Sequence, residues 1–472
     1  MTMHRRTSAG SCPAPTVTGV EVSSPVRARP LLSNGAAAGA VGAALLLVAA
    51  AAVVGARLTA SGSRLYLGAP PLFAQWLPHT GPGTIPVVLL AVAAIVLSGR
   101  AVDTLRTGTL LAGGYVVSLG WTFLLDAVDR SQRAFGAPLA DPNEYLADLP
   151  RITSVSGFLR TFADHIVDFR PGSWTTHVSS HPPLATLFFW ALDRLGMAGA
   201  GWAGVWVIVI GCTVTITVPV TLRLVGSPAA ARRVVPFLVF TPSAVWVGTS
   251  ADGMFAGVAA SALAVLTLAA TRRRHWAAAV LGTAGGVLAA ATVFLSYGLA
   301  VLAVPAAALL LLTRRRRADG WPLAWGTAGA AAGAVFALFA AGGFWWPQGL
   351  SLLHTRYYQG IAAQRPYGYF VWADLAALTV SAGPVLAVSL TVAARRIRVL
   401  DPAAVLVAAT ALAVLVADLS GLSKAETERI WLPFVPWLMG AAGLLKGRMT
   451  WWLCSIQVIT ALAVNHLLLT PW

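Results

Sequence analysis

Apolar stretches of membrane-spanning length recur from residue 36 almost to the end of the chain. A helix needs about 17 to 25 mostly apolar residues to cross a hydrocarbon core of roughly 30 Å. Charged residues make up only 11% of the 472 positions, whereas soluble globular proteins carry about 25%. A water-exposed surface cannot be covered by so few charges. The sequence therefore excludes a soluble enzyme and favours one polytopic membrane domain.

Backbone groups in lipid must satisfy their hydrogen bonds within the protein, which predicts that these stretches are helices. We expect an all-α polytopic membrane protein with about 13 transmembrane helices, formed by residues 35–472 after a disordered cytoplasmic tail at residues 1–34. The tail is too long and polar for the start of a normal signal peptide. The predicted helices cover residues 36–57, 84–99, 109–126, 203–223, 234–249, 252–271, 276–293, 297–313, 321–344, 371–393, 402–419, 430–446 and 451–470.

The arginines predict how these helices are oriented, because short cytoplasmic loops carry an excess of Lys and Arg. With a cytoplasmic N-terminus, 21 of the 33 Lys and Arg residues fall on cytoplasmic segments and 13 of the 17 acids fall at or near the outer side. This arrangement requires residues 182–197, which contain Asp193 and Arg194, to lie flat outside as a juxtamembrane helix. We expect a multi-pass protein of the cytoplasmic (plasma) membrane with two ordered external segments, residues 126–201 and 345–370.

The formal net charge of +16 would suggest a nucleic-acid partner in a soluble protein. Here the arginines lie in short clusters between apolar stretches, so the charge indicates topology and no nucleic-acid partner is expected. The three cysteines, Cys12, Cys212 and Cys454, are far apart in the sequence. They offer neither a disulfide framework nor a CxxC metal site.

Four acids in the first external segment are candidate general bases. A partly desolvated carboxylate at the outer rim of a bundle can remove a proton from a hydroxyl group. The alternative is that these acids face water or pair with nearby arginines. A helix end holds two of them at the rim, which places those two first in the ranking of catalytic candidates: Asp129, Asp126, Glu144 and Asp141.

A histidine pair, His177 and His181, precedes Pro182 and Pro183 at the start of the predicted juxtamembrane helix. The free N–H groups of that helix start could receive a phosphate, with the imidazoles adding hydrogen bonds or charge. Alternatively, His181 caps the helix and His177 is solvated. Two histidines four residues apart before two prolines do not form a helical ligand pair, so no metal ligand is assigned.

One further acid, Asp252, is predicted at the outer tip of a tight helical hairpin. It serves water, a cation or a ligand, because an unpaired charge there would be expensive, or it caps its helix, and both roles can hold together. We include it among the candidate substrate-binding residues with the two histidines.

Three arginines and a tyrosine complete the candidate binding residues. Arg356, Tyr357 and Arg365 lie among the aromatic residues of the second external segment, and Arg429 lies at the last outer turn. The aromatic residues are either an interfacial belt or part of a clamp in which the guanidinium groups hold a phosphate. Arg429 could complete the same anion-binding pocket.

Four landmarks follow one another along the chain: the acidic first loop, His181-Pro182-Pro183-Leu184, Thr241-Pro242 through Asp252, and Arg429-Ile430-Trp431-Leu432-Pro433-Phe434-Val435-Pro436. Their order and sidedness resemble the GT-C superfamily of membrane glycosyltransferases, especially the protein O-mannosyltransferases and the lipid A aminoarabinose transferases, over about residues 109–450. Two features depart from that family. Two apolar stretches precede the acidic loop instead of one, and the adjacent Asp-Glu pair is missing, so the base stays open among the four acids.

The resemblance implies an inverting glycosyltransferase that moves a sugar from a polyprenyl-phosphate donor to an acceptor hydroxyl at the outer face of the cytoplasmic membrane. The implied partners are this donor, membrane lipid, and an acceptor that is a glycan, a glycolipid or a protein. No cofactor is implied, and a divalent cation is compatible but not required. One alternative is a transporter or flippase for an anionic lipid or solute. A transporter should hold its ionisable residues on broken helices near the midplane, whereas here the expected spans carry almost no charges at mid-depth. Another is a non-catalytic scaffold in envelope assembly.

Overall fold

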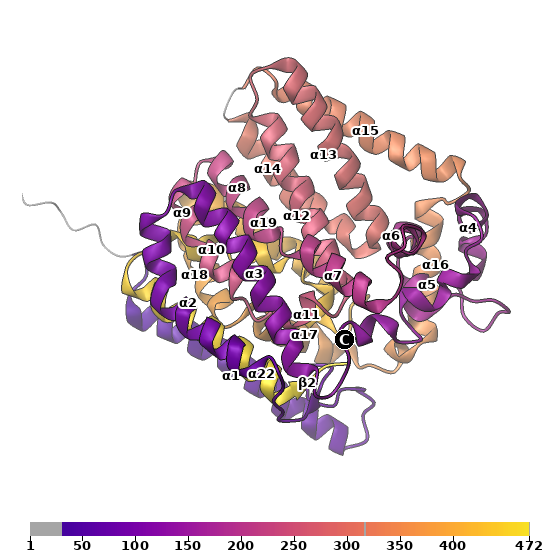
Figure 1. Cartoon of the computed structure of the whole chain (residues 1–472), viewed down its shortest axis with the longest axis horizontal. Coiled ribbons are helices and arrows are strands. Elements are labelled where there is room, and N and C mark those ends of the chain that lie inside the picture. Colours follow the sequence, from indigo (N-terminus) through magenta and orange to yellow (C-terminus); the bar gives the residue numbers. More distant parts are fainter. Residues whose placement is uncertain (1–30, 316–317, 472) are drawn as a thin grey trace, which may run out of the picture.

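The computed structural model describes residues 31–315 and 318–471, which form a helical bundle (Figure 1). The predicted tail lies outside the described residues as far as residue 30. Helix α1 (Asn34–Ala60) begins at the end of that tail, where the Ser33 hydroxyl accepts a hydrogen bond from the Ala36 amide at 3.2 Å. The expected all-α class is confirmed for the described part of the chain, whose strands are two residues long each.

Nine helical segments of the described chain are long and apolar enough to cross a membrane, and a bent pair makes a possible tenth. The bent pair, α17 (Tyr367–Ala382) and α18 (Val385–Arg396), turns by 103° at Gly383-Pro384. The nine are α1, α2 (Thr84–Thr104), α3 (Thr107–Asp129), α7 with α8 (Ala200–Gly211 and Val214–Val225), α12 (Ala251–Ala270), α13 (His275–Leu295), η4 with α14 (Tyr297–Leu302 and Ala303–Arg314), α15 (Trp321–Ala341) and α19 (Pro402–Leu419).

Nine of the 13 expected spans are confirmed as helices of sufficient length and apolarity, the expected span at residues 371–393 is the bent pair, and three are not confirmed. Residues 234–249 form α10 (Val235–Val239) and α11 (Ala244–Val247), which are separated around Pro242. Residues 430–446 are divided in the same way around Pro433, between α20 (Thr427–Ile430), α21 (Val435–Leu438) and η7 (Gly440–Leu444). Proline lacks the N–H that continues a helix and clashes with the preceding turn, which explains both interruptions. The third, α22 (Arg448–Leu467), is continuous but more polar, with Gln457 and Asn465 buried on it.

Short helices form the two segments that were expected to be external and ordered. The stretch expected to lie flat is α6 (Pro183–Arg194), whose 12 residues span about 18 Å, less than a hydrocarbon core. The other short helices of the chain are η1 (Ala137–Ala140), η2 (Tyr145–Arg151), α4 (Val155–Thr161), η3 (Ala163–His165), α5 (Thr176–Ser180), α9 (Pro228–Arg233), α16 (Trp346–Gln359), η5 (Ile361–Ala363) and η6 (Ile397–Val399).

Arginines from distant parts of the sequence gather at one end of the bundle. The Arg232 side chain donates to the Thr107 hydroxyl at 2.9 Å, where α3 begins, and Arg395 donates to the Leu31 carbonyl at 3.1 Å, just before α1. Helix α3 leads from this basic end to Asp129 at the other end. The bundle therefore separates its arginine clusters from the acids of residues 126–201 along its length.

Helices α13 and α15 pack through small residues. A Cβ atom at Gly282 would collide with the carbonyl oxygen of Ala324, and one at Gly286 would collide with that of Ala328. Spacings of four residues on both helices let the two backbones approach, as small residues commonly do between membrane helices.

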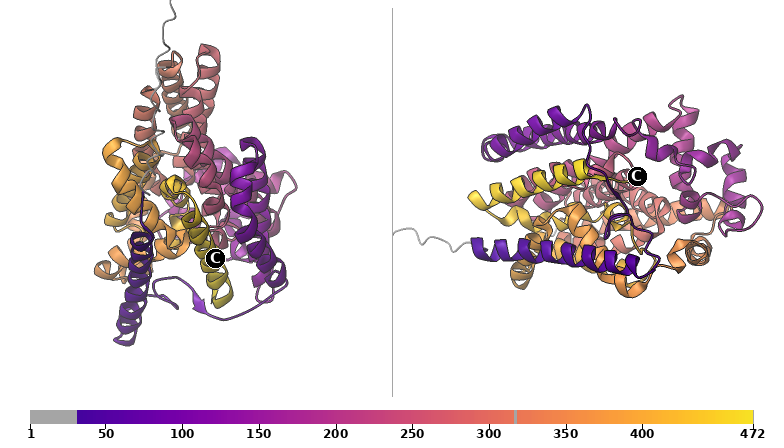
Figure 2. Two further views of the ribbon diagram at one scale, coloured as in Figure 1. Left: turned by 90° about the vertical axis from the view of Figure 1, so that its left-hand side faces the viewer. Right: turned by 90° about the horizontal axis from the view of Figure 1, so that it is seen from below.

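The segment between α1 and α2 is tied to the C-terminus by strands β1 (Gln75–Trp76) and β2 (Leu468–Leu469). They pair antiparallel, with Gln75 opposite Leu469. Both views of Figure 2 show α22 between α1 and the α2–α3 pair. The segment at residues 61–83 thus crosses the end of the bundle that carries the acids, and we call it the strap.

Candidate functional site

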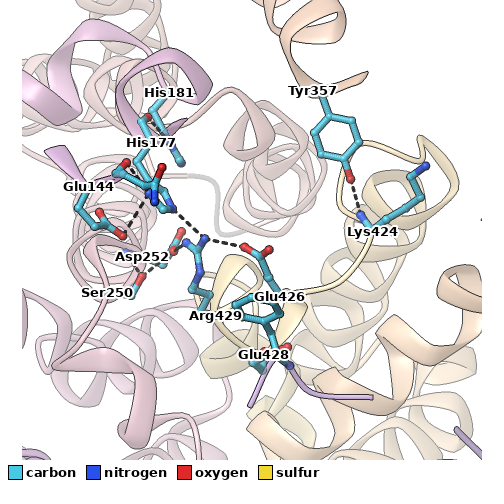
Figure 3. Close-up of polar contacts among 12 residues, drawn as sticks. Glu144, His177, His181, Ser250, Asp252, Tyr357, Lys424, Glu426, Glu428 and Arg429 are labelled. Carbon is cyan, nitrogen blue, oxygen red and sulfur yellow. Dashed lines mark hydrogen bonds and ion pairs between the residues drawn. The ribbon is translucent and has the colours of Figure 1, made fainter. Parts of the chain in front are cut away.

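The candidate site is a buried cluster around Arg429 (Figure 3). It includes Asp252 at the start of α12, whereas the arginine cluster at residues 272–274 follows the other end of that helix. The Arg429 guanidinium group donates to Asp252 Oδ2 at 2.7 Å, to Glu426 Oε2 at 2.9 Å and to His177 Nε2 at 2.9 Å. Arg429 itself is 5% exposed. Hydrogen bonds to ionised partners are roughly twice as strong as neutral ones, so these contacts fix the guanidinium in one orientation.

Asp252 lies in the first turn of α12, and a neighbouring serine fixes its position. Ser250 is the N-cap of the helix, and its Oγ accepts from the Asp252 amide at 3.2 Å while donating to Asp252 Oδ2 at 2.7 Å. The alternative in which Asp252 itself caps the helix is therefore wrong. With Ser250 as the cap, the Asp252 carboxylate is directed to Arg429.

His177 connects Arg429 to Glu144. Its Nδ1 lies 3.0 Å from the Asn143 carbonyl oxygen and 3.3 Å from Glu144 Oε1, while its Nε2 faces the Arg429 guanidinium. A carbonyl only accepts and a guanidinium only donates, so the proton lies on Nδ1 and Nε2 is the acceptor. Burial lowers the pKa of His177 well below its usual value, and the adjacent Arg429 lowers it further. The neutral ring orients its two neighbours and supplies no positive charge for a phosphate, contrary to one of the roles expected for it.

Glu144 is the carboxyl group of this cluster whose pKa is strongly raised. It is 3% exposed, and its Oε2 has no hydrogen-bond partner within the described chain. Burial raises its pKa to about 8; Arg429 opposes the shift, and the charges of Asp252 and Asp141 add to it. A carboxyl group with a pKa near the working pH suits a general base, because it binds the abstracted proton firmly yet is partly ionised.

His181 packs beside this cluster and does not cap α6. Its Nδ1 donates to the His177 carbonyl at 2.9 Å, and its ring lies 5.5 Å from that of Phe255 and 5.6 Å from that of Tyr145. Burial lowers its pKa as well. We assign it a packing role that positions α5 against α12.

Asp129, the first-ranked base candidate, lies outside the cluster and joins three elements. Its Oδ1 accepts from Asn465 on α22 at 3.0 Å and lies 2.9 Å from His79 Nε2 on the strap, and its Oδ2 accepts from Arg133 at 2.7 Å. With both oxygens engaged, Asp129 is a structural residue that joins α3, the strap and α22.

The other two candidate bases also lie apart from Arg429. Asp126, also buried on α3, lies 3.5 Å from the Arg130 guanidinium. Asp141 is exposed and accepts from the Asn143 amide at 2.8 Å in a local turn. Of the four predicted bases, the structure brings Glu144 alone into contact with the cluster.

The two arginines of residues 345–370 hold protein groups. Arg365 is buried, donating to the carbonyl oxygens of Leu65 at 3.3 Å and Lys424 at 2.8 Å and to Glu426 Oε1 at 3.3 Å. Glu426 therefore bridges Arg365 and Arg429. In this arrangement Arg365 acts on the cluster through Glu426, whereas the sequence predicted a direct phosphate contact.

Arg356 and Tyr357, neighbours on α16, connect that helix to residues 168–179 and to the loop before α20. Arg356 donates to Asp168 Oδ2 at 2.6 Å and to the Ser179 hydroxyl at 3.1 Å. The Tyr357 hydroxyl accepts from the Lys424 amide at 2.7 Å (Figure 3). Both residues fasten α16 over α5 and the α20 loop.

Glu426 and Ser250 were not among the predicted site residues. Both stand near predicted ones, Glu426 three residues before Arg429 and Ser250 two before Asp252. Such spacings signal local side-chain contacts. The left-handed backbone of Ala425 (φ 69°) and Glu426 (φ 64°) carries no comparable signal, because residues other than glycine rarely adopt it. Here Asp374 Oδ1 accepts from the Ala425 amide at 3.0 Å and holds the loop in that form.

Two observations bear on ligands and relatives. Within the described residues, no group of three His, Cys, Asp or Glu side chains is placed to hold a metal ion. No protein-family model and no curated protein matches the sequence. The resemblance to GT-C enzymes thus stays a prediction from the motifs.

Proposed function

We propose that this chain is an inverting glycosyltransferase that moves a sugar from a polyprenyl-phosphate donor to an acceptor hydroxyl. The observation that carries the proposal is the buried series Glu144, His177, Arg429 and Asp252. It joins a carboxyl group with a pKa of about 8 to a fixed guanidinium through one neutral imidazole. The GT-C-like order of motifs supports the same reaction class, but the choice of Glu144 as base depends on the geometry.

In the proposed step, the ionised Glu144 takes the proton of the acceptor hydroxyl as the acceptor oxygen attacks the anomeric carbon. The bond between that carbon and the phosphate oxygen breaks from the opposite side, which inverts the anomeric centre. The polyprenyl phosphate leaves with the bonding electron pair. Negative charge thus moves from Glu144 to the phosphate, and Arg429, held in place by Asp252 and Glu426, stabilises it there.

Electrostatic balance supports Glu144 as the group that changes charge. The guanidinium groups of Arg429 and Arg365 face the carboxylates of Asp252 and Glu426. Burial and the charges of Asp252 and Asp141 disfavour an ionised Glu144 and outweigh the attraction of Arg429, so its pKa is raised to about 8. The ionised form is therefore a stronger base than an ordinary carboxylate.

We place the reaction at the outer face of the cytoplasmic membrane, with the N-terminus cytoplasmic. The arginine clusters at the opposite end of the bundle support this orientation. Helix α6 then lies along the outer interface as the juxtamembrane helix, in keeping with its length of 12 residues. The acceptor is a glycan, a glycolipid or a protein.

Assaying membranes that contain the full-length chain, with a radiolabelled polyprenyl-phosphate sugar and a mixture of envelope acceptors, tests the proposed reaction. We expect label to move from the lipid to an acceptor, with loss of this transfer in Glu144→Gln membranes. Membranes with an equal amount of folded chain and no transfer from any polyprenyl-phosphate sugar would contradict the proposal.

A second candidate function, transport of an anionic lipid or solute, is favoured by one observation. The buried Asp252 and Arg429 adjoin the interrupted segments α10–α11 and α20–α21, and discontinuous helices often form transporter sites. Uptake or flipping by proteoliposomes without sugar transfer would support this candidate over the enzyme.

A further inference from the structure

We propose that the groove at the turn between α12 and α13 binds the headgroup of an anionic phospholipid. The groove has a volume of about 560 Å³ and lies at the basic end of the bundle, opposite the Arg429 cluster. Arg272, Arg273 and Arg274 line one part of it, and Trp276 and Val280 line another. It is therefore a site for a molecule with an anionic part and an apolar part.

The three arginines form no ion pair within the described chain. None of their guanidinium groups makes a side-chain hydrogen bond or an ion pair with a described residue, and all three are exposed. Asp319, the acid in the turn before α15, forms no ion pair among the described residues either. Three adjacent positive charges repel one another, so an anion between them relieves the repulsion and gains charge-assisted hydrogen bonds.

Some arginines at the same end are engaged with the protein. Arg396 pairs with Asp401 at 3.4 Å, Arg395 donates to the Leu31 carbonyl and Arg232 donates to Thr107. Orientation of the chain in a membrane accounts for arginines at this end in general, but it does not account for three consecutive arginines that line one groove.

The apolar side of the groove favours a lipid over a free anion. Trp276 is 67% exposed and Val280 is 61% exposed, and their spacing of four residues places them on one face of α13 below the arginines. Tryptophan prefers the level of lipid headgroups. Acyl chains can lie along Trp276 and Val280 while the phosphate remains among the guanidinium groups, an arrangement that inorganic phosphate cannot use.

The N-terminus of α13 adds to the anionic preference. This 21-residue helix has Arg274 as its N-cap, which makes no side-chain capping bond. The free amide groups at the start of a helix point away from it along its axis, here toward the loop that carries the three arginines. Such amide groups favour a bound negative charge.

Native mass spectrometry of the purified full-length chain tests the proposal, with phosphatidylglycerol and phosphatidylcholine added to the same detergent. We expect the wild-type chain to retain phosphatidylglycerol over phosphatidylcholine. The triple substitution Arg272→Gln, Arg273→Gln and Arg274→Gln should weaken this retention at least about tenfold, since each basic residue contributes about a kcal/mol near an anionic lipid. The matched control replaces Arg395, Arg396 and Arg398 with Gln and should retain the lipid.

A second variant and a competitor separate the lipid from other ligands. Trp276→Ala keeps every charge and should still weaken phosphatidylglycerol retention by several-fold. Equal losses in the triple variant and its control would show a nonspecific surface charge and overturn the proposal. Displacement of phosphatidylglycerol by an equal concentration of inorganic phosphate would also overturn it, because it would show a site for a free anion.

Discussion

Arg429 donates to Asp252 at 2.7 Å, and this contact joins residues 177 positions apart in the sequence at a fully buried place. Arg429 also donates a hydrogen bond to Glu426, and Asp252 also accepts one from Ser250. The pair is therefore part of a connected network whose members depend on one another. A buried charge deprived of its partner keeps its desolvation cost, which makes the network sensitive to single substitutions.

Replacing Arg429 with Met should destabilise the chain strongly, because Asp252 would be left without its cation. We expect a loss of about 3–5 kcal/mol in the free energy of unfolding, measured by chemical denaturation in detergent. Asp401→Asn is the control, since its ion pair with Arg396 is longer and more exposed and should contribute less than about 1 kcal/mol. Equal effects of the two substitutions would show that the Arg429 network has no special structural role.

Glu144 should make stability depend on pH. Its pKa is about 8 in the folded chain against an ordinary value of 4.5, so the folded state keeps a proton that the unfolded state releases between these values. The stability from this proton is fully present below about pH 4.5 and is lost as the pH rises through about 8. Thermal unfolding of wild type and Glu144→Gln from pH 5 to 9 should show a smaller decline in the variant. Parallel curves would contradict the raised pKa.

Asp129→Asn should separate stability from activity. The substitution weakens the contacts to His79, Arg133 and Asn465 without touching the Arg429 cluster. We expect a loss of about 1–3 kcal/mol in unfolding free energy, with sugar transfer per folded molecule close to that of wild type. A large fall in transfer by the folded fraction would return Asp129 to the list of candidate bases.

Arg365 should act as a positioning residue for Arg429. Arg365→Gln removes the charge that holds Glu426 Oε1, so Glu426 and then Arg429 should shift. We expect transfer to fall roughly 10- to 100-fold, chiefly in kcat, with partial rescue by Arg365→Lys. A rise in donor KM with an unchanged kcat would instead indicate that Arg365 binds the phosphate directly.

Substitution by alanine should lower the stability of the chain at Gly286 and raise it at Gly326. A Cβ at Gly286 meets the Ala328 carbonyl, whereas a Cβ at Gly326 on α15 meets nothing within 4 Å. We expect Gly286→Ala to destabilise the α13–α15 pair by about 1–3 kcal/mol. Gly326→Ala should instead stabilise the helix by about 0.5–1 kcal/mol. Thermal unfolding of both variants measures the contrast, and a neutral Gly286→Ala would show that the two helices can separate freely.

Much of the fold could be predicted because the length of an apolar stretch determines whether a helix can cross lipid. The prediction of membrane-spanning helices failed where a proline interrupts an apolar stretch, at Pro242 and Pro433. Composition alone does not show whether a proline kinks a helix or ends it. The prediction also failed at α22, where buried Gln457 and Asn465 make an otherwise suitable helix more polar.

Several site residues were predicted from the sequence. Which of them contact Arg429 and which lie apart from it was not predicted. Asp129 ends α3 and Glu144 follows it in the next segment, and the sequence ranked Asp129 first. Its partners His79 and Asn465 lie 50 and 336 positions away, and His177 lies 252 positions from Arg429. Contacts over such separations depend on the packing of the whole bundle, so local spacing cannot assign them.

The most direct test of the central claim, that Glu144 is the base beside Arg429, is single-turnover sugar transfer from a radiolabelled polyprenyl-phosphate donor. Purified Glu144→Gln should be compared with Asp141→Asn, a matched acid-to-amide change in the same loop. We predict that Glu144→Gln slows transfer by roughly 10² to 10⁴-fold at unchanged donor affinity, while Asp141→Asn stays within about twofold of wild type. Wild-type rates in folded Glu144→Gln protein would contradict the account.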